Sequence, residues 1–203
     1  MKRTFILLAV VVALLGALAF IYSLERPSAN RDGGSEVSAV DPDWLKARLD
    51  GPMKKLVVRA APAPLPDATL IDADGKPVDL AAWKGKWVVL NLWATWCAPC
   101  RKEMPALDAL NRAYDARGLS VVTIATGPNP VPAIRAFFAE TGVTSLPIVR
   151  DPDQSFARAL GVFGLPTTLL LDPEGREVAR MQGEADWAGA EAHRLAEALL
   201  ARP

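Results

Sequence analysis

The apolar residues of this chain form one long run near its start and several shorter runs later, separated by turn-forming residues. The long run covers residues 5–22. Three shorter runs are rich in aliphatic and aromatic residues, as buried strands are, and cover residues 88–93, 119–125 and 167–171. Apolar residues recur at helical spacing over residues 98–117, 132–140 and 186–201. This alternation of strand and helix patterns predicts an α/β domain.

The run at residues 5–22 has the length and composition of a membrane-spanning helix. At ~1.5 Å per residue it would be about 27 Å long, close to the thickness of the hydrocarbon layer. Lys2 and Arg3 precede it, so the positive-inside rule places the N-terminus in the cytoplasm and the rest outside. Ala17-Leu18-Ala19 resembles a signal-peptidase site, and a cleaved signal peptide is the alternative. We expect an uncleaved single-pass anchor over residues 1–23, with the body of the chain in a bacterial periplasm.

The anchor is expected to be followed by a linker and one domain. Residues 24–40 are rich in Ser, Gly, Asn and charged residues and have no periodicity, which predicts a flexible linker. The remaining residues, 41–203, are long enough for one domain. At its start, Asp41-Pro42-Asp43 can cap a helix over residues 44–55, and we expect the apolar face of that helix to pack on the domain.

Turn-forming and helix-breaking residues delimit the remaining elements. Residues 60–66 are Pro-rich and predict an extended entry to the domain, and the β-like runs on either side of Asp74-Gly75 predict a hairpin. The same reasoning predicts, in chain order, a loop at 127–130, a short strand at 147–150, a short helix at 154–160, a turn at 172–175 and an antiparallel return strand at 177–182.

The only two cysteines of the chain, Cys97 and Cys100, lie between a predicted strand and a predicted helix. This C-x-x-C spacing in an α/β context indicates a dithiol–disulfide redox centre. A thiolate at a helix N-terminus is stabilised by the unpaired N–H groups and the helix dipole, which lowers the pKa of the thiol. Cys97 is therefore predicted to be the attacking sulfur, and Cys100 the more buried resolving sulfur. Pro99 fits the first helical turn, where its missing N–H costs nothing.

Composition and charge exclude several other classes of protein. A zinc site built on the C-x-x-C pair would need two more ligands, and the chain has a single histidine, His193, and no further cysteine, so we expect no metal. His193 is expected on the surface of the last helix. The chain carries 23 basic and 23 acidic residues without a long basic run, which argues against a nucleic-acid partner.

Two segments of the chain resemble a known superfamily. The run at residues 93–100 (WATWCAPC) and the later run at 164–168 (GLPTT) resemble the thioredoxin superfamily. More narrowly, they resemble its membrane-anchored TlpA-like branch, which includes ResA-like and cytochrome c maturation reductases. The likeness extends from about Pro62 to the C-terminus. It implies a thioredoxin fold, in which helices flank a central mixed sheet, with an N-terminal extension and an inserted helix–strand unit over roughly residues 129–150.

The resemblance also implies a set of site residues. Pro166 is expected to be a cis-proline packed against the cysteine pair, and Leu165 is expected to offer backbone groups to the substrate. Trp96 is expected to border the site and take part in docking. Glu103, three residues after Cys100, is expected to assist proton transfer, although a surface carboxylate near a helix start is the alternative. The predicted substrate-contacting set is completed by Ala98, Pro99 and Thr167.

Asn91 departs from the pattern of thioredoxins proper. It stands six residues before Cys97, where those proteins have a buried acid, and ResA-like proteins have an asparagine. The departure removes one candidate proton acceptor for Cys100. An ordinary polar strand residue is an equal alternative.

The resemblance implies thiol–disulfide exchange with other exported proteins, in the direction of reduction and without a bound cofactor. Electrons would come from a membrane-spanning donor protein, and apocytochrome c or copper-site assembly proteins are the implied substrates. An oxidase of the same fold remains an alternative, as does a copper-binding assembly module, although no Met/His cluster lies beside the motif. A peroxidase is disfavoured because Asn91, and not a proline, precedes Thr95 by four residues.

Overall fold

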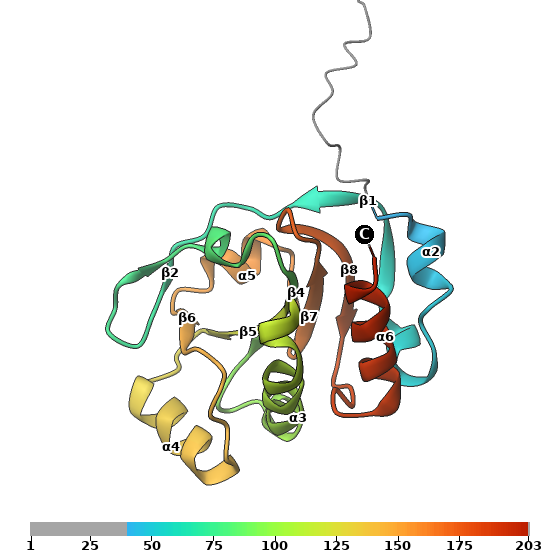
Figure 1. Cartoon of the computed structure of the whole chain (residues 1–203). Helices are drawn as coiled ribbons and strands as arrows, with labels where there is room; N and C mark the ends of the chain where they lie inside the picture. Colours follow the sequence, from blue (N-terminus) through green and yellow to red (C-terminus); the bar gives the residue numbers. More distant parts are fainter. Residues whose placement is uncertain (1–39, 203) are drawn as a thin grey trace, which may run out of the picture. The chain divides into compact units, whose positions relative to one another are not determined.

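The computed structural model describes residues 40–202 of the chain, which form one mixed sheet covered by helices on both faces (Figure 1). The strands are β1 (Val57–Pro64), β2 (Leu70–Ile71), β3 (Pro77–Val78), β4 (Trp87–Trp93), β5 (Leu119–Thr126), β6 (Val149–Asp151), β7 (Thr167–Leu171) and β8 (Arg176–Gln182). The α-helices are α2 (Pro42–Lys46), α3 (Ala98–Tyr114), α4 (Val131–Thr141), α5 (Ser155–Ala159) and α6 (Ala190–Leu200). Single 3₁₀ turns lie at η1 (Gly51–Lys55), η2 (Leu80–Trp83) and η3 (Asp115–Arg117).

Strand β4, which leads into the cysteine pair, lies near the middle of the sheet. The strand order is β1-β8-β7-β4-β5-β6-β2-β3, and β4 pairs in parallel with β5 and antiparallel with β7. All seven residues of β4 are buried, as expected for a near-continuous apolar strand covered on both faces. Because β4 is held on both edges and both faces, it gives the residues that follow it a rigid base.

The two faces of the sheet carry separate hydrophobic clusters. One cluster joins one face of β4 and β5 to helices α2, α3, α4 and α6, with Val89, Trp93 and Leu107 among its members. The other joins the opposite face to α5 and η2, with Leu90 and Phe156 fully buried in it. The predicted α/β architecture, with helices on both faces of a mixed sheet, is therefore confirmed.

Most of the predicted elements are present, some of them shorter than expected. The hairpin at Asp74-Gly75 forms from β2 and β3, which have two residues each. The Pro-rich segment at 60–66 lies largely in β1, an edge strand that pairs with β8 and can therefore contain prolines. A helix and a short strand, α4 and β6, occupy the region expected to hold an inserted unit. The α-helix after the cysteines ends at Tyr114, three residues before the predicted end, and η3 continues it to Gly118.

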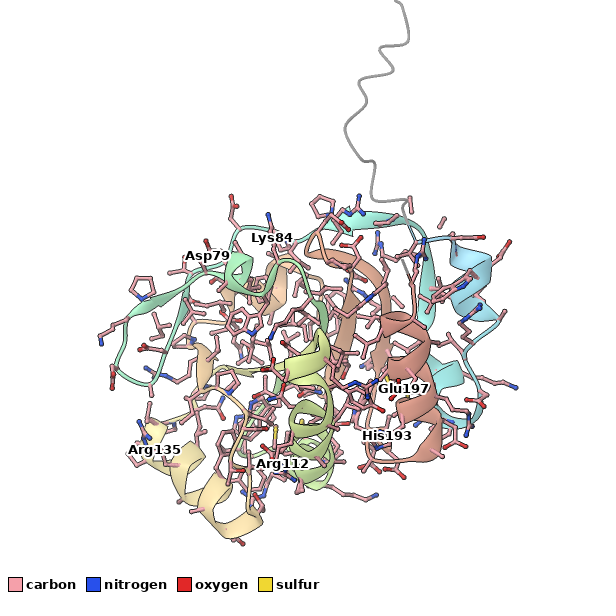
Figure 2. The ribbon with its side chains drawn as sticks, in the orientation of Figure 1. Asp79, Lys84, Arg112, Arg135, His193 and Glu197 are labelled. Atoms are coloured by element: carbon pink, nitrogen blue, oxygen red, sulfur yellow. A yellow bond between two sulfur atoms is a disulfide. The ribbon has the colours of Figure 1, made fainter. Side chains whose placement is uncertain are left out.

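Three expectations about the helical segments were wrong in detail. The single helix predicted over 44–55 is replaced by α2, which ends at Lys46, and by η1, which begins at Gly51; the φ of +45° at Gly51 and the proline that follows it do not allow one continuous helix. The last helix begins at Ala190 and not at residue 186. His193, expected on the surface, is half-buried, and its Nδ1 lies 2.9 Å from the hydroxyl of Tyr114 on α3. Figure 2 labels His193 and Glu197 on α6.

The predicted anchor at 1–23 and all but the last residue of the predicted linker at 24–40 lie outside the described residues. That last residue, Val40, is buried in the hydrophobic core, so packing begins one residue earlier than predicted. Between residues 40 and 202, no helix combines the length and the apolar character needed to cross a bilayer.

Candidate active site

Cys97 and Cys100 lie at the junction of β4 and α3 and form a disulfide in this structure. Cys97 is the N-cap residue of α3, and its Sγ accepts a hydrogen bond from the backbone N–H of Cys100 at 3.3 Å. Cys97 is 6% exposed, whereas Cys100 is fully buried. The backbone N–H that reaches the Sγ of Cys97 is the kind of donor that stabilises a thiolate once the disulfide is reduced. The structure thus places Cys97 at the helix cap and Cys100 deeper, as predicted, while their attacking and resolving roles stay predictions.

An open groove of about 520 Å³ runs beside Cys97. Two large side chains on its walls are unusually exposed, Trp96 at 61% and Phe163 at 98%. Arg158 is the charged residue that lines it. The complete lining consists of Trp96, Cys97, Pro99, Thr126, Gln154, Ala157, Arg158, Val162, Phe163, Gly164 and Leu165. Exposed aromatic side chains around a reactive sulfur suit the docking of another polypeptide.

The predicted cis-proline is present. The bond between Leu165 and Pro166 is cis, and Leu165 lines the same groove as Cys97. Within residues 40–202, the backbone N–H and C=O of Leu165 form no hydrogen bond. Pro166 is buried behind it, and its C=O accepts a hydrogen bond from the N–H of Gly183.

The remaining predicted contact residues divide into two groups. Trp96 and Pro99 line the groove, and Ala98 is exposed at the start of α3. Thr167, by contrast, is 5% exposed and does not line the groove. Its hydroxyl donates to the C=O of Gly164 at 2.7 Å, so its side chain shapes the loop that carries Leu165.

Glu103 is buried below the cysteine pair, one helical turn after Cys100. It is 3% exposed, so the alternative of a surface carboxylate is wrong. Its Oε1 accepts a hydrogen bond from Asn91 Nδ2 at 2.8 Å. Its Oε2 accepts from the N–H of Ala185 at 3.1 Å and from Nε1–H of Trp187 at 3.2 Å. Burial raises the pKa of Glu103 to about 6, against the effect of these three hydrogen bonds.

Asn91 is tied into the same buried network. It is fully buried at the centre of β4, and its Nδ2 also lies 2.9 Å from Oγ1 of Thr168 on the neighbouring strand β7. Asn91 thus orients the carboxylate of Glu103 from the sheet side. A carboxylate with a pKa near neutral, one turn from the resolving cysteine, is suited to accept its proton.

Sequence reasoning missed four residues of the site. Phe163 and Arg158 line the groove, Trp187 contacts Glu103, and Asn129 hydrogen-bonds to Thr95 in the loop before Cys97. Phe163 carried a local signal, since it is a large apolar residue in a loop bounded by Gly161 and Gly164, and Asn129 lies between two prolines. Trp187 carried none, because its partner is 84 residues away.

The two basic residues after Cys100 both have acidic partners. Arg101 lies 3.6 Å from Glu140 and stacks over the ring of Phe137, with 4.2 Å between the guanidinium carbon and the ring centroid. Lys102 lies 2.8 Å from Glu184. Their positive charges near the cysteine pair are therefore partly offset. The part of the chain from Val40 to Arg202 contains no cluster of three or more His, Cys, Asp or Glu side chains that could hold a metal ion.

Comparison with known protein sequences identifies relatives of this chain. A sequence model of the Redoxin family matches residues 60–199. The thiol-disulfide oxidoreductase ResA of Bacillus subtilis is 37% identical over 118 residues, which cover 58% of this chain and 65% of that protein, slightly less than two thirds of its length. The protein of the same name from Bacillus thuringiensis is 34% identical over 119 residues, which cover 59% of this chain and 68% of that protein.

Solved structures give the same result. A secreted thiol-disulfide isomerase from Corynebacterium glutamicum has a TM-score of 0.62 at 26% identity, covering 72% of this chain and 92% of the other. A thiol:disulfide interchange protein from Chlorobium tepidum has a TM-score of 0.58 at 28% identity, covering 70% and 99%. Together with the cysteine pair, these relatives confirm the thioredoxin-like fold and support a thiol:disulfide oxidoreductase. The chain belongs to the Redoxin family, as a ResA-like member of the thioredoxin superfamily.

Proposed function

We propose that this protein is exported, anchored in the membrane by residues 1–23, and reduces disulfides in other exported proteins. The observation that carries the proposal is the arrangement of the two sulfurs. Cys97 lies at the helix N-terminus on an open groove, while Cys100 is buried one turn from the raised-pKa carboxylate of Glu103. One sulfur can therefore meet a client protein, and the other can be deprotonated away from solvent.

The reaction proceeds in two exchange steps. The thiolate of Cys97 attacks one sulfur of a client disulfide, forming a bond between Cys97 and the client and releasing the other client sulfur as a thiolate that takes up a proton. Cys100 then transfers its proton to Glu103 and attacks Sγ of Cys97. The mixed disulfide breaks, the second client sulfur leaves as a thiolate and is protonated, and Cys97–Cys100 is left as a disulfide. Two electrons have passed to the client.

The groove gives the first step its geometry. An extended client segment can pair with the free N–H and C=O of Leu165, which places a client cysteine beside Cys97. Trp96 and Phe163, which line the same groove and are largely exposed, can then contact the client. Pairing through the client's backbone does not depend on its side chains, so it allows clients of different sequence. The exposed aromatic side chains add apolar contacts that require no particular client residue.

Export and pathway rest on the sequence and its resemblance. The apolar run at 5–22 follows two basic residues, which favours a cytoplasmic N-terminus and a periplasmic domain. The TlpA-like resemblance favours apocytochrome c or copper-site assembly proteins as clients. Each turnover leaves the cysteine pair oxidised, so a membrane-spanning dithiol protein is required as the electron donor.

The reduction potential of the Cys97–Cys100 pair in the full chain tests the direction of transfer. Thioredoxin has a potential of about −270 mV and the oxidant DsbA about −120 mV. We expect a value near or below that of thioredoxin, together with insulin-disulfide reduction that is lost in Cys97→Ser. A potential near that of DsbA would make the protein a disulfide donor, and intact insulin reduction in Cys97→Ser would exclude the exchange chemistry altogether.

A further inference from the structure

A buried asparagine joins the loop that carries Cys97 to the loop before α4. Asn129 is 4% exposed, and its side-chain amide uses both of its ends. Oδ1 accepts hydrogen bonds from the N–H of Thr95 at 2.7 Å and from its hydroxyl at 2.9 Å. Nδ2 donates to the C=O of Thr126 at 2.8 Å and to the C=O of Gly127 at 3.3 Å. Four hydrogen bonds thus converge on one side chain beside the active site.

Thr95, which Asn129 binds, lies just after the end of the central strand, where the hydrogen bonds of the sheet have ended. Strand β4 ends at Trp93, and Thr95 is two residues before Cys97, directly before Trp96. Within the loop at residues 94–96, the N–H of Cys97 donates to the C=O of Ala94 at 3.1 Å. The other hydrogen bonds that the structure describes for this loop are the two from Thr95 to Asn129. Pro128 and Pro130 flank Asn129 and restrict the φ angles around it, which stiffens the loop from which it projects.

The same network extends to α5, which contributes Ala157 to the lining of the groove. The hydroxyl of Thr126 donates to Oδ2 of Asp151 at 3.0 Å. The carboxylate of Asp151 in turn accepts the backbone N–H groups of Phe156 and Ala157 in α5, at 3.2 and 2.9 Å. Ala157 lines the groove that Cys97 opens into. Buried, mutually bonded polar groups of this kind fix one arrangement of the elements that they join.

We propose that Asn129 is a positioning residue for the nucleophile: it holds Thr95 so that Cys97 caps α3 and Trp96 stands at the groove wall. The proposal rests on the proposed function and deepens it, because it gives the loop before α4 a definite role in the first exchange step. Asn129 touches neither the client nor the reacting sulfur. Its effect passes through Thr95 to Cys97, whose thiolate is then set at the unpaired N–H groups of the helix start.

The test compares Asn129→Ala with Asn111→Ala in the full chain. Asn111 is also a buried bridge, near the other end of α3, with Oδ1 accepting from the N–H of Val121 at 2.8 Å and Nδ2 donating to the C=O of Ser145 at 3.1 Å. Both variants lose a buried bridging amide, so both should lose stability. The discriminating readout is the pH profile of Cys97 alkylation by iodoacetamide in the reduced protein, measured beside insulin-disulfide reduction.

We expect Asn129→Ala to raise the apparent pKa of Cys97 and to slow both reactions by roughly tenfold or more, since small displacements of a nucleophile are costly. Asn111→Ala should leave the alkylation profile unchanged. Thr95→Val keeps the N–H and removes only the hydroxyl contact, and a smaller shift in the same direction is expected if Asn129→Ala does not fold. Unchanged profiles in Asn129→Ala and in Thr95→Val would overturn the inference. A wild-type protein that alkylates normally but does not reduce insulin would instead overturn the proposed function.

Discussion

Replacing Glu103 by glutamine removes the buried charge below the cysteine pair and keeps the shape of the side chain. The carboxylate now accepts hydrogen bonds from Asn91 Nδ2, the N–H of Ala185 and Nε1–H of Trp187. A glutamine can keep the last two with its oxygen and turn its NH₂ towards Asn91. Oδ1 of Asn91 is buried and has no hydrogen-bond partner among the side chains that the structure describes, so the Asn91 amide can rotate and accept this donor. We therefore expect Glu103→Gln to fold.

The magnitude follows from the pKa of Glu103, which burial raises from its usual value of 4.5 to about 6. The folded protein then binds this proton more tightly than the unfolded chain does, so the free energy of unfolding falls as pH rises through this window. The contribution is fully present below pH 4.5 and is lost above about pH 6. At about 1.36 kcal/mol per pKa unit, the loss amounts to about 2 kcal/mol.

Urea unfolding of the oxidised protein across this pH range measures the effect. Other carboxylates complicate the wild-type curve alone: Asp72 and Asp115, for example, have lowered pKa values, and their contributions are lost only as the pH falls further. The difference between wild type and Glu103→Gln removes these common contributions. We expect the variant to gain about 2 kcal/mol relative to wild type between pH 4.5 and about pH 6, and then to hold that gain.

Glu184 offers a matched control for this measurement. It lies beside Glu103 in the same region but is partly exposed, and it pairs with Lys102 at 2.8 Å. Glu184→Gln should cost less than about 1 kcal/mol, as exposed ion pairs do. It should keep most of the fall in unfolding free energy with pH, because the charge of Glu184 is a smaller cause of the raised pKa of Glu103 than burial is. A stability difference between wild type and Glu103→Gln that stays constant from pH 4 to 8 would refute the argument, because the carboxylate would then titrate alike in the folded and unfolded states.

The same substitution has a kinetic consequence. If Glu103 accepts the proton of Cys100, the rate of insulin reduction should rise with pH through about 6 as the carboxylate becomes charged. Glu103→Gln should lose this rise and be slower by roughly tenfold or more near neutral pH. An unchanged pH dependence would leave Glu103 with a purely structural role.

The remaining predictions concern the sulfurs, the groove and the core. Cys97→Ser should abolish insulin reduction, whereas Cys100→Ser should accumulate a mixed disulfide through Cys97 that mass spectrometry detects; a variant of Cys100 that turns over normally would contradict the assigned roles. Trp96→Ala and Phe163→Ala should raise KM for a client with little change in unfolding free energy, because both side chains are largely exposed. Phe156→Ala, in a fully buried position, should cost ~3–5 kcal/mol of unfolding free energy in urea titrations, and a loss below about 1 kcal/mol would contradict the packing described.

Local pattern in the sequence was sufficient for most elements of the fold. The apolar run of β4 is buried throughout, and β7 spans the residues predicted for it. The failure at residues 44–55 shows the limit of such patterns. Leu45, Leu49 and Met53 are all buried, as their spacing suggested, yet α2 ends at Lys46 and η1 begins only at Gly51. Apolar spacing identified the buried residues correctly, but it could not by itself show that Leu49 lies between two short helical segments.

The environment of the candidate site could not be predicted in the same way. The cysteine pair at Cys97 and Cys100 could be predicted from motif spacing, and the cis-proline at Pro166 from the resemblance. The state of Glu103 depends on Asn91, 12 residues away, and on Ala185, 82 residues away. Whether a carboxylate on a helix is exposed or buried is decided by such tertiary contacts, which a single sequence does not contain. The resemblance predicted that Glu103 assists proton transfer, but its burial, which raises its pKa, is known only from the structure.

The residues that position Cys97 differ from those that hold the carboxylate near Cys100. The loop that carries Cys97 is held by Asn129 from the segment before α4, whereas the carboxylate near Cys100 is held by Asn91 from β4 and by the loop before α6. No hydrogen bond between described residues links these two sets of contacts directly. The effects of the two substitutions on insulin reduction should therefore add. Asn129→Ala should keep the fall in unfolding free energy that the titration of Glu103 causes up to about pH 6, and Glu103→Gln should leave the rate of Cys97 alkylation unchanged. A double variant whose losses in insulin reduction fall well short of additive would mean that the attack of Cys97 and the deprotonation of Cys100 are coupled through the protein, and that the two sulfurs are not tuned independently.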